Sequence, residues 1–172
     1  MVQSTMDGEA LRAVQGPLKQ QYRDDAAAAR ITLHAEGGLD TGLTCSVQTG
    51  QALVKAGLHP ATGGDGLSAC SGDMLLQALV ACAGVTLQAV ATSLGLDVTG
   101  TVSAEGDLDF RGTLGVDKEA PVGFTDIRLT FTLDSDADEE QIATLIRLTE
   151  RYCVVFQTLA RPPSLTVSTP EA

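Results

Sequence analysis

The feature that most constrains this chain is one long, mostly apolar stretch, MLLQALVACAGVTLQAVATSLGL, at residues 74–96. Its hydrophobic residues recur at spacings of three and four and form two adjoining faces, which predicts a helix from about residue 73 to 94. The stretch is long enough to raise the question of a membrane span, but Gln77, Thr86 and Gln88 interrupt it and no Lys or Arg flanks it closely. We therefore expect a core helix of a soluble protein, packed in the middle of the fold or against a partner subunit, and no membrane association.

Strand patterns lie on both sides of this helix. Alternating or short apolar runs predict strands before it at 29–36, 43–49 and 51–57, with turn residues at 37–42 that make the first two a hairpin, and strands after it at 98–110, 125–135 and 164–169. A second helix is predicted from about residue 137 onward, with acids in its first turn. Hairpins combined with two core helices give an α+β fold.

The domain organisation follows from the chain's length of 172 residues, which suits one sizeable core. Residues 1–27 are expected to form a polar helical arm, and residues 28–172 a single domain. The N-terminus has neither a positively charged segment nor an apolar one of the secretory kind, so a cytoplasmic location is expected. The formal net charge of −11 argues against nucleic acid and anionic membrane surfaces as partners.

The chain contains four cysteines, at positions 45, 70, 82 and 153, and two histidines, at 34 and 59. None of the cysteines forms a CxxC pair and the histidines have no HxxxH spacing, so no metal site and no cofactor is expected. Permanent disulfides are uncommon in a reducing cytosol. A thiol of this chain could therefore serve as a redox group or a nucleophile. The alternative is that each cysteine is a small core residue.

Two of the cysteines lie in segments that together resemble the two-cysteine signature of the OsmC/Ohr family. The first, SGDMLLQALVACAGVTL (71–87), is a glycine-rich loop and an acidic residue followed by an apolar helix that carries Cys82. The second, LTERYCVVFQTL (148–159), places Cys153 late on the second predicted helix. The order of elements is similar to that family from about residue 28 to the end. The resemblance implies an OsmC-like fold, with antiparallel sheets packed around a long central helix, and an intertwined homodimer with its sites at the interface.

The resemblance also implies a reaction, the thiol-dependent reduction of organic hydroperoxides. Cys82 would be the peroxidatic thiolate and Cys153 the resolving cysteine, with an external dithiol as reductant. The active peroxidases of the family use an arginine upstream of the first cysteine, and no arginine occurs in residues 58–73. Asp73 and His59 are therefore the supporting residues predicted here.

His59 ranks first among the groups that would lower the pKa of Cys82, ahead of three other basic residues, Arg30, Lys55 and Arg111. The alternative function is that of a catalytically silent member of the family, which binds a small apolar molecule in the pocket between helix and sheet. The scarcity of arginine near Cys82 favours this alternative, and the retained cysteine pair favours the peroxidase.

Overall fold

The computed structural model describes residues 7–24, 36–39, 44–49, 52–115 and 117–169. Its centre is α2 (Ser71–Leu94), a helix with one continuous buried face formed by Leu79, Ala83, Leu87 and Ala91. The helix ends at Gly95, whose positive φ of 72° lets its N–H reach the carbonyls of Ala91 and Thr92. The predicted helix at 73–94 is thus confirmed. In the described part of the chain, α2 alone is long and apolar enough to span a membrane, a test that core helices of soluble proteins also pass.

A long hairpin covers one side of α2. It consists of β5 (Thr99–Leu108) and β6 (Phe124–Asp134), which pair antiparallel from Thr99 opposite Asp134 to Leu108 opposite Phe124. Along β6 the apolar side chains Ile127, Leu129, Phe131 and Leu133 are half-buried, whereas the residues between them are exposed. The predicted strands at 98–110 and 125–135 are confirmed, and the period of two marks the face of the hairpin that meets the helices.

Two helices follow the hairpin, α4 (Glu139–Tyr152) and α5 (Val154–Ala160). Asp138 begins α4 with a capping box, since its carboxylate accepts from the Gln141 N–H while the Gln141 side chain accepts from the Asp138 N–H. Leu145 on α4 is fully buried against Leu87 and Ala91 of α2. The sequence predicted one uninterrupted helix here, but the chain is extended at Cys153, with φ −71° and ψ 110°, and therefore forms two.

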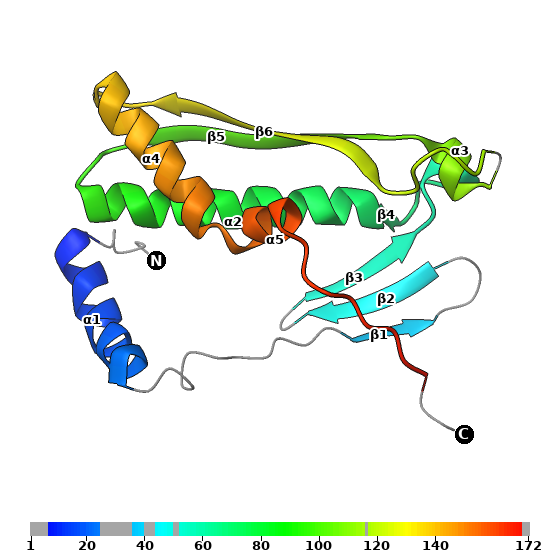
Figure 1. Ribbon diagram of the computed structural model, residues 1–172, viewed down its shortest axis with the longest axis horizontal. Coiled ribbons are helices and arrows are strands. Elements are labelled where there is room, and N and C mark those ends of the chain that lie inside the picture. The colour runs from blue at the N-terminus through cyan, green and yellow to red at the C-terminus, as the bar shows by residue number, and fades with distance from the viewer. Residues whose placement is uncertain (1–6, 25–35, 40–43, 50–51, 116, 170–172) are drawn as a thin grey trace.

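A second sheet lies beside the N-terminal part of α2 (Figure 1). Its strands β1 (Glu36–Leu39), β2 (Thr44–Thr49), β3 (Ala52–Gly57) and β4 (Ala69–Cys70) stand in the order β1-β2-β3-β4. The strands predicted at 43–49 and 51–57 are confirmed. Of the strand predicted at 29–36, only Glu36 is among the described residues, and β1 occupies part of the segment predicted as a turn, where Leu39 pairs with Cys45.

The two ends of the chain differ from each other in how they pack. At the N-terminus, α1 (Gly8–Asp24) continues through Pro17 and contacts the C-terminal end of α2, where Gly8 approaches the carbonyl of Thr92. At the C-terminus, residues 161–169 are exposed and the strand predicted at 164–169 is not formed. Leu165 and Val167 are 89% and 93% exposed. A strand requires a neighbouring edge with which to exchange hydrogen bonds, and none is paired with this segment in the described part of the single chain.

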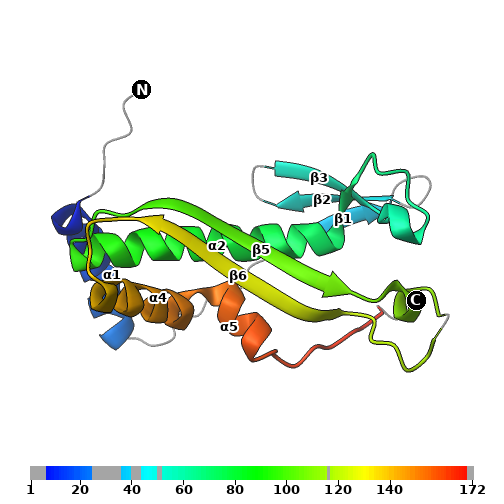
Figure 2. The same cartoon turned by 90° about the horizontal axis from the view of Figure 1, so that it is seen from above.

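The arrangement is a mixed one, with a hairpin on one side of the central helix and α4 and α5 on another (Figure 2). The α+β class predicted from the order of elements is therefore correct. Cys82 lies about midway along α2, and the break between α4 and α5 lies beside that part of the helix, since α2 contacts both.

Candidate thiol site

The site is built on two cysteines from separate helices. Cys82 lies in the middle of α2 and its side chain is half-buried, whereas Cys153 occupies the single extended residue between α4 and α5 and is 1% exposed. Each thiol is a hydrogen-bond partner of the other. Both are free thiols. The fold thus brings together two residues that are 71 positions apart in the sequence.

The break in the helix at Cys153 has local causes that can be followed in its hydrogen bonds. The N–H of Cys153 still donates to the Thr149 carbonyl at 2.9 Å, and the Cys153 carbonyl accepts from the N–H of Gln157 at 3.0 Å. Cys153 therefore ends one helix and begins the next. The side chain of Gln157 then donates from Nε2 to the carbonyl of Glu150 at 2.8 Å, which fixes α5 against the last turn of α4.

The break exposes the first backbone N–H groups of α5, which have no carbonyl partner within their own helix. Two of them, from Val154 and Val155, act as hydrogen-bond donors that lower the pKa of Cys82. The Thr86 hydroxyl, one turn along α2, is a further hydrogen-bond partner of the same sulfur. Among the described residues, the groups that lower the pKa of Cys82 are therefore neutral donors.

These contacts shift the pKa values of the two thiols in opposite directions. Burial raises the pKa of Cys82, but the hydrogen bonds from Val155, Cys153, Val154 and Thr86 together outweigh burial, so that its pKa falls below the ordinary cysteine value. For Cys153, burial raises the pKa, and donating its proton to Cys82 raises it further. The arrangement favours one thiolate, on Cys82, beside one protonated thiol, on Cys153.

The two supporting residues predicted from the sequence lie elsewhere. Asp73 is exposed in the first turn of α2, about two and a half turns before Cys82. It does not cap the helix, because Cys70 occupies the N-cap position and makes no side-chain capping bond. A carboxylate in this turn favours the helix through its macrodipole.

His59 also lies near the beginning of α2 rather than beside Cys82. Its ring stacks on Phe110 with centroids 5.1 Å apart, and its Nδ1 accepts the N–H of Ala61 at 3.0 Å. Phe110 follows β5, whose last residue Leu108 lies near Gly72 in the first turn of α2. The described part of the chain therefore brings the two cysteines together, and brings neither His59 nor Asp73 to them.

The other basic residues considered from the sequence have different surroundings. Arg111 forms ion pairs with Asp109 and Asp117 around the short helix α3 (Phe110–Thr113). Lys55 is exposed on β3, and Arg30 is outside the described residues. The groups that lower the pKa of Cys82 were not identified from the sequence, because backbone N–H groups have no sequence signature and only the break at Cys153 makes them available.

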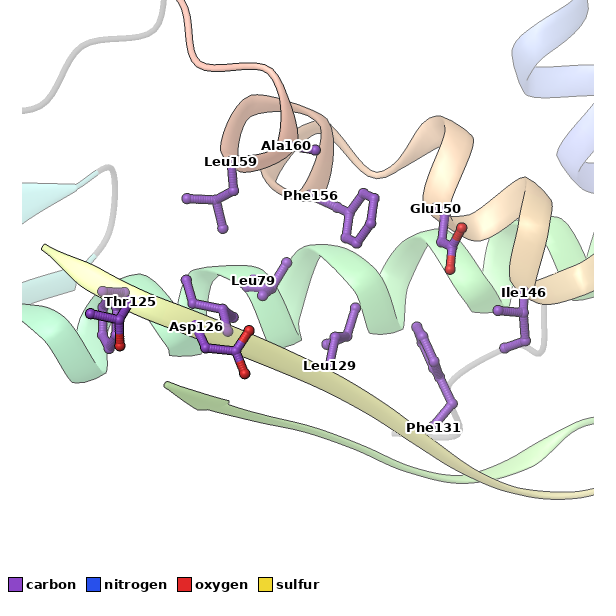
Figure 3. A pocket seen from close by; sticks show the side chains of 12 residues that line it. Leu79, Thr125, Asp126, Leu129, Phe131, Ile146, Glu150, Phe156, Leu159 and Ala160 are labelled. Atoms are coloured by element: carbon purple, nitrogen blue, oxygen red, sulfur yellow. The ribbon is translucent and has the colours of Figure 1, made fainter. Parts of the chain in front are cut away.

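An apolar pocket of about 490 Å³ lies between β6 and the helices. Its walls, seen in Figure 3, come from four elements and include Leu79, Leu129, Phe131, Ile146, Phe156 and Leu159. Neither cysteine is among its lining residues, but Leu79 precedes Cys82 by three residues on α2 and Phe156 follows Cys153 by three, so the lining includes a residue about one turn from each thiol. Asp126 and Glu150 are the acidic residues in its lining. We refer to it below as the apolar pocket.

The fold and the site define a class, α+β proteins in which a long central helix carries one thiol and the break between two neighbouring helices supplies a second. The family model for OsmC-like proteins matches residues 63–168, which is more than half of the chain, and the chain belongs to this family. Among curated proteins, none is a significant match.

Solved structures of low sequence identity share the fold. An OsmC-like protein from Mycoplasma pneumoniae is 17% identical, with a TM-score of 0.64 over 77% of this chain and 89% of that chain. A hypothetical protein from Aquifex aeolicus is 15% identical, with a TM-score of 0.59 over 77% and 90%. An OsmC-like protein of unknown function from Vibrio cholerae is 13% identical, with a TM-score of 0.58 over 75% and 94%. At these identities the likeness extends to the fold alone.

Proposed function

We propose that this protein reduces organic hydroperoxides, with Cys82 as the peroxidatic and Cys153 as the resolving cysteine. The observation that carries the proposal is the contact between the two thiols, in which the pKa of Cys82 is lowered and that of Cys153 is raised. A peroxidatic cysteine must be a thiolate to attack, and its resolving partner must lie within reach of the product. Membership of the OsmC-like family agrees with this function.

The reaction begins at the Cys82 sulfur. Its thiolate attacks the distal oxygen of the hydroperoxide, the O–O bond breaks, and the alkoxide that leaves takes up one proton to become the alcohol. Cys82 is thereby oxidised to a sulfenic acid. The thiol of Cys153 can supply this proton, because it is a hydrogen-bond donor to the attacking Cys82 sulfur.

Resolution forms the disulfide. The deprotonated Cys153 sulfur attacks the sulfur of Cys82, and the S–O bond breaks with release of water once the hydroxide is protonated. One hydroperoxide and two thiols thus give one alcohol, one water and one disulfide. An external dithiol then reduces the disulfide by exchange.

Access decides where that dithiol attacks. Cys82 is half-buried and Cys153 is 1% exposed, so the attack falls on the Cys82 sulfur and Cys153 leaves as the thiol. We place the protein in the cytoplasm, where such reductants keep thiols reduced. The apolar pocket beside the thiols accommodates the organic part of the hydroperoxide.

We further propose that the working form is a homodimer. Val85, three residues after Cys82, is 73% exposed, and Val154, next to Cys153, is 71% exposed. Exposed apolar side chains on both sides of a reactive thiol pair favour a covering partner, and the intertwined dimer implied by the family resemblance would supply it.

Steady consumption of cumene hydroperoxide in the presence of dithiothreitol tests the enzymatic function. Cys82→Ser should abolish turnover, whereas Cys153→Ser should retain the first reduction and accumulate a sulfenic acid on Cys82. Cys70→Ser is the matched control, since Cys70 lies at the start of α2 and should not affect the rate. Reaction of the wild-type protein no faster than free cysteine would contradict the proposal.

A second candidate function is the binding of a small apolar molecule without catalysis. The apolar pocket favours it, because its volume of about 490 Å³ lies within the range of small-molecule sites. Isothermal titration with decanol distinguishes this function from the first, since binding to the pocket should survive Cys82→Ser. No binding by either protein would contradict it.

A further inference from the structure

A hollow rich in arginine lies next to the apolar pocket, between the end of α4 and α5. It measures about 550 Å³ and is lined by Arg147, Glu150, Arg151, Phe156, Gln157 and Arg161. We call it the arginine hollow. Its three arginines belong to a chain in which acids outnumber Lys and Arg by 22 to 11, so positive charge is concentrated here against the overall balance.

Within the described residues, no ion pair neutralises the arginines of the hollow. The ion pairs among the described residues involve Arg111 and Arg128, and none of them includes an arginine of the hollow. Arg151 lies 5.8 Å from the ring centroid of Tyr152, a contact that leaves its hydrogen-bond donors free for an anion. The lining of the hollow contains three guanidinium groups and one carboxylate, that of Glu150, so its net charge is about two positive charges.

The hollow and the apolar pocket are neighbours, because Glu150 and Phe156 line both. Figure 3 shows these two side chains on the helix side of the pocket, opposite Leu129 of β6. The other acid of the pocket, Asp126, is held by Arg128 at 2.6 Å on β6. An apolar cavity therefore adjoins a cluster of arginines that are outside the ion pairs of the described residues.

We propose that the apolar pocket and the arginine hollow form one binding site for a single-chain alkyl phosphate, with the tail in the pocket and the phosphate at Arg147, Arg151 and Arg161. A phosphate monoester carries between one and a half and two negative charges near neutral pH, about the charge that the hollow leaves uncompensated. The guanidinium fork also matches phosphate oxygens in geometry. The inference rests on the second function above, the binding of an apolar molecule, and does not need the thiol chemistry.

Calorimetric titration of the full chain with three ligands of equal tail length, kept below their aggregation limits, tests the proposal. Decyl phosphate should bind most tightly, decanoate less tightly, and decanol most weakly. Inorganic phosphate should bind much more weakly than decyl phosphate, because each buried methylene strengthens binding by about fourfold. Since the arginines are exposed, added salt should weaken the binding of decyl phosphate but not of decanol.

The variant Arg147→Gln/Arg151→Gln should weaken decyl phosphate binding by about tenfold or more and leave decanol unchanged. Arg12→Gln, at an exposed arginine of α1, is the control for the loss of a charge elsewhere on the chain. Equal affinities for decyl phosphate and decanol would overturn the proposal and leave the pocket function intact. Equal affinities for decyl phosphate and decanoate would overturn the choice of phosphate, and no binding of any decyl ligand would overturn the pocket function as well.

Discussion

The thiol of Cys153 is a hydrogen-bond donor to the sulfur of Cys82, and this bond lowers the pKa of Cys82 and raises the pKa of Cys153. Cys82 lies within the regular helix α2, whereas Cys153 is the single extended residue between the helices α4 and α5. The same break that presents the Cys153 thiol also presents the N–H groups of Val154 and Val155 to Cys82. The position of the second cysteine and the lowered pKa of the first thus have one structural cause.

The donors around Cys82 predict its pH dependence. Because the pKa of Cys82 is lowered, its thiolate fraction, and with it the rate of alkylation by iodoacetamide, should rise with pH through a midpoint below that of free cysteine. Removal of a donor destabilises the thiolate, so Cys153→Ala and Thr86→Val should each move this midpoint upward. Thr92→Val, on the same helix, should leave it unchanged. A midpoint unaffected by either of the first two substitutions would contradict the account of the site.

His59 provides a test of which groups activate the thiol. In the structure this residue stacks on Phe110 and accepts the Ala61 N–H near the start of α2. His59→Ala should therefore leave the rate of Cys82 with cumene hydroperoxide within about twofold of wild type, the change expected of a variant that touches none of the donors. A loss of tenfold or more, measured by stopped-flow at neutral pH, would restore His59 as the activating residue predicted from the sequence.

The sequence predicted the helices, the strands and the two cysteines better than it predicted the groups around Cys82. The periods of three to four along residues 74–94 and of two along 125–135 are local, and they correctly gave α2 and β6. The position of Cys82 and Cys153 came from the resemblance of their surroundings to a known family. The break at Cys153 has no local signal, since LTERYCVVFQTL contains neither Gly nor Pro, and it arises where α5 packs against α4 and α2. The absence of a strand at 164–169 likewise depends on which edge is available to pair, a property of the whole fold.

The exposed apolar residues beside the thiols predict the oligomeric state. Sedimentation velocity at micromolar concentration should give a homodimer, and Val85→Asp should shift it toward monomer, because it places a charge in the apolar surface next to Cys82. Glu119→Gln, at an exposed residue away from α2, should have no effect. A wild-type protein that sediments as a stable monomer would contradict the dimer.

The core between α2 and α4 predicts a large effect on stability. Leu145 is 0% exposed and packs with Leu87, Ala91 and Val98. Leu145→Ala should lower the free energy of unfolding by about 2–5 kcal/mol, as other large-to-small substitutions in cores do. Leu67→Ala, at a residue 87% exposed, should change it by less than about 0.5 kcal/mol. Urea denaturation followed by circular dichroism measures both, and similar values for the two variants would contradict the packing described here.

The most direct test of the central claim is peptide mapping by mass spectrometry after the reduced protein has received one equivalent of cumene hydroperoxide. The control is the same protein without hydroperoxide. When it is unfolded and treated with iodoacetamide, Cys70, Cys82 and Cys153 should all be alkylated. The account predicts that Cys82 and Cys153 are recovered as one disulfide-linked pair while Cys70 remains a free thiol. Recovery of Cys82 and Cys153 as free thiols, or a disulfide that joins Cys82 to any other cysteine, would contradict it.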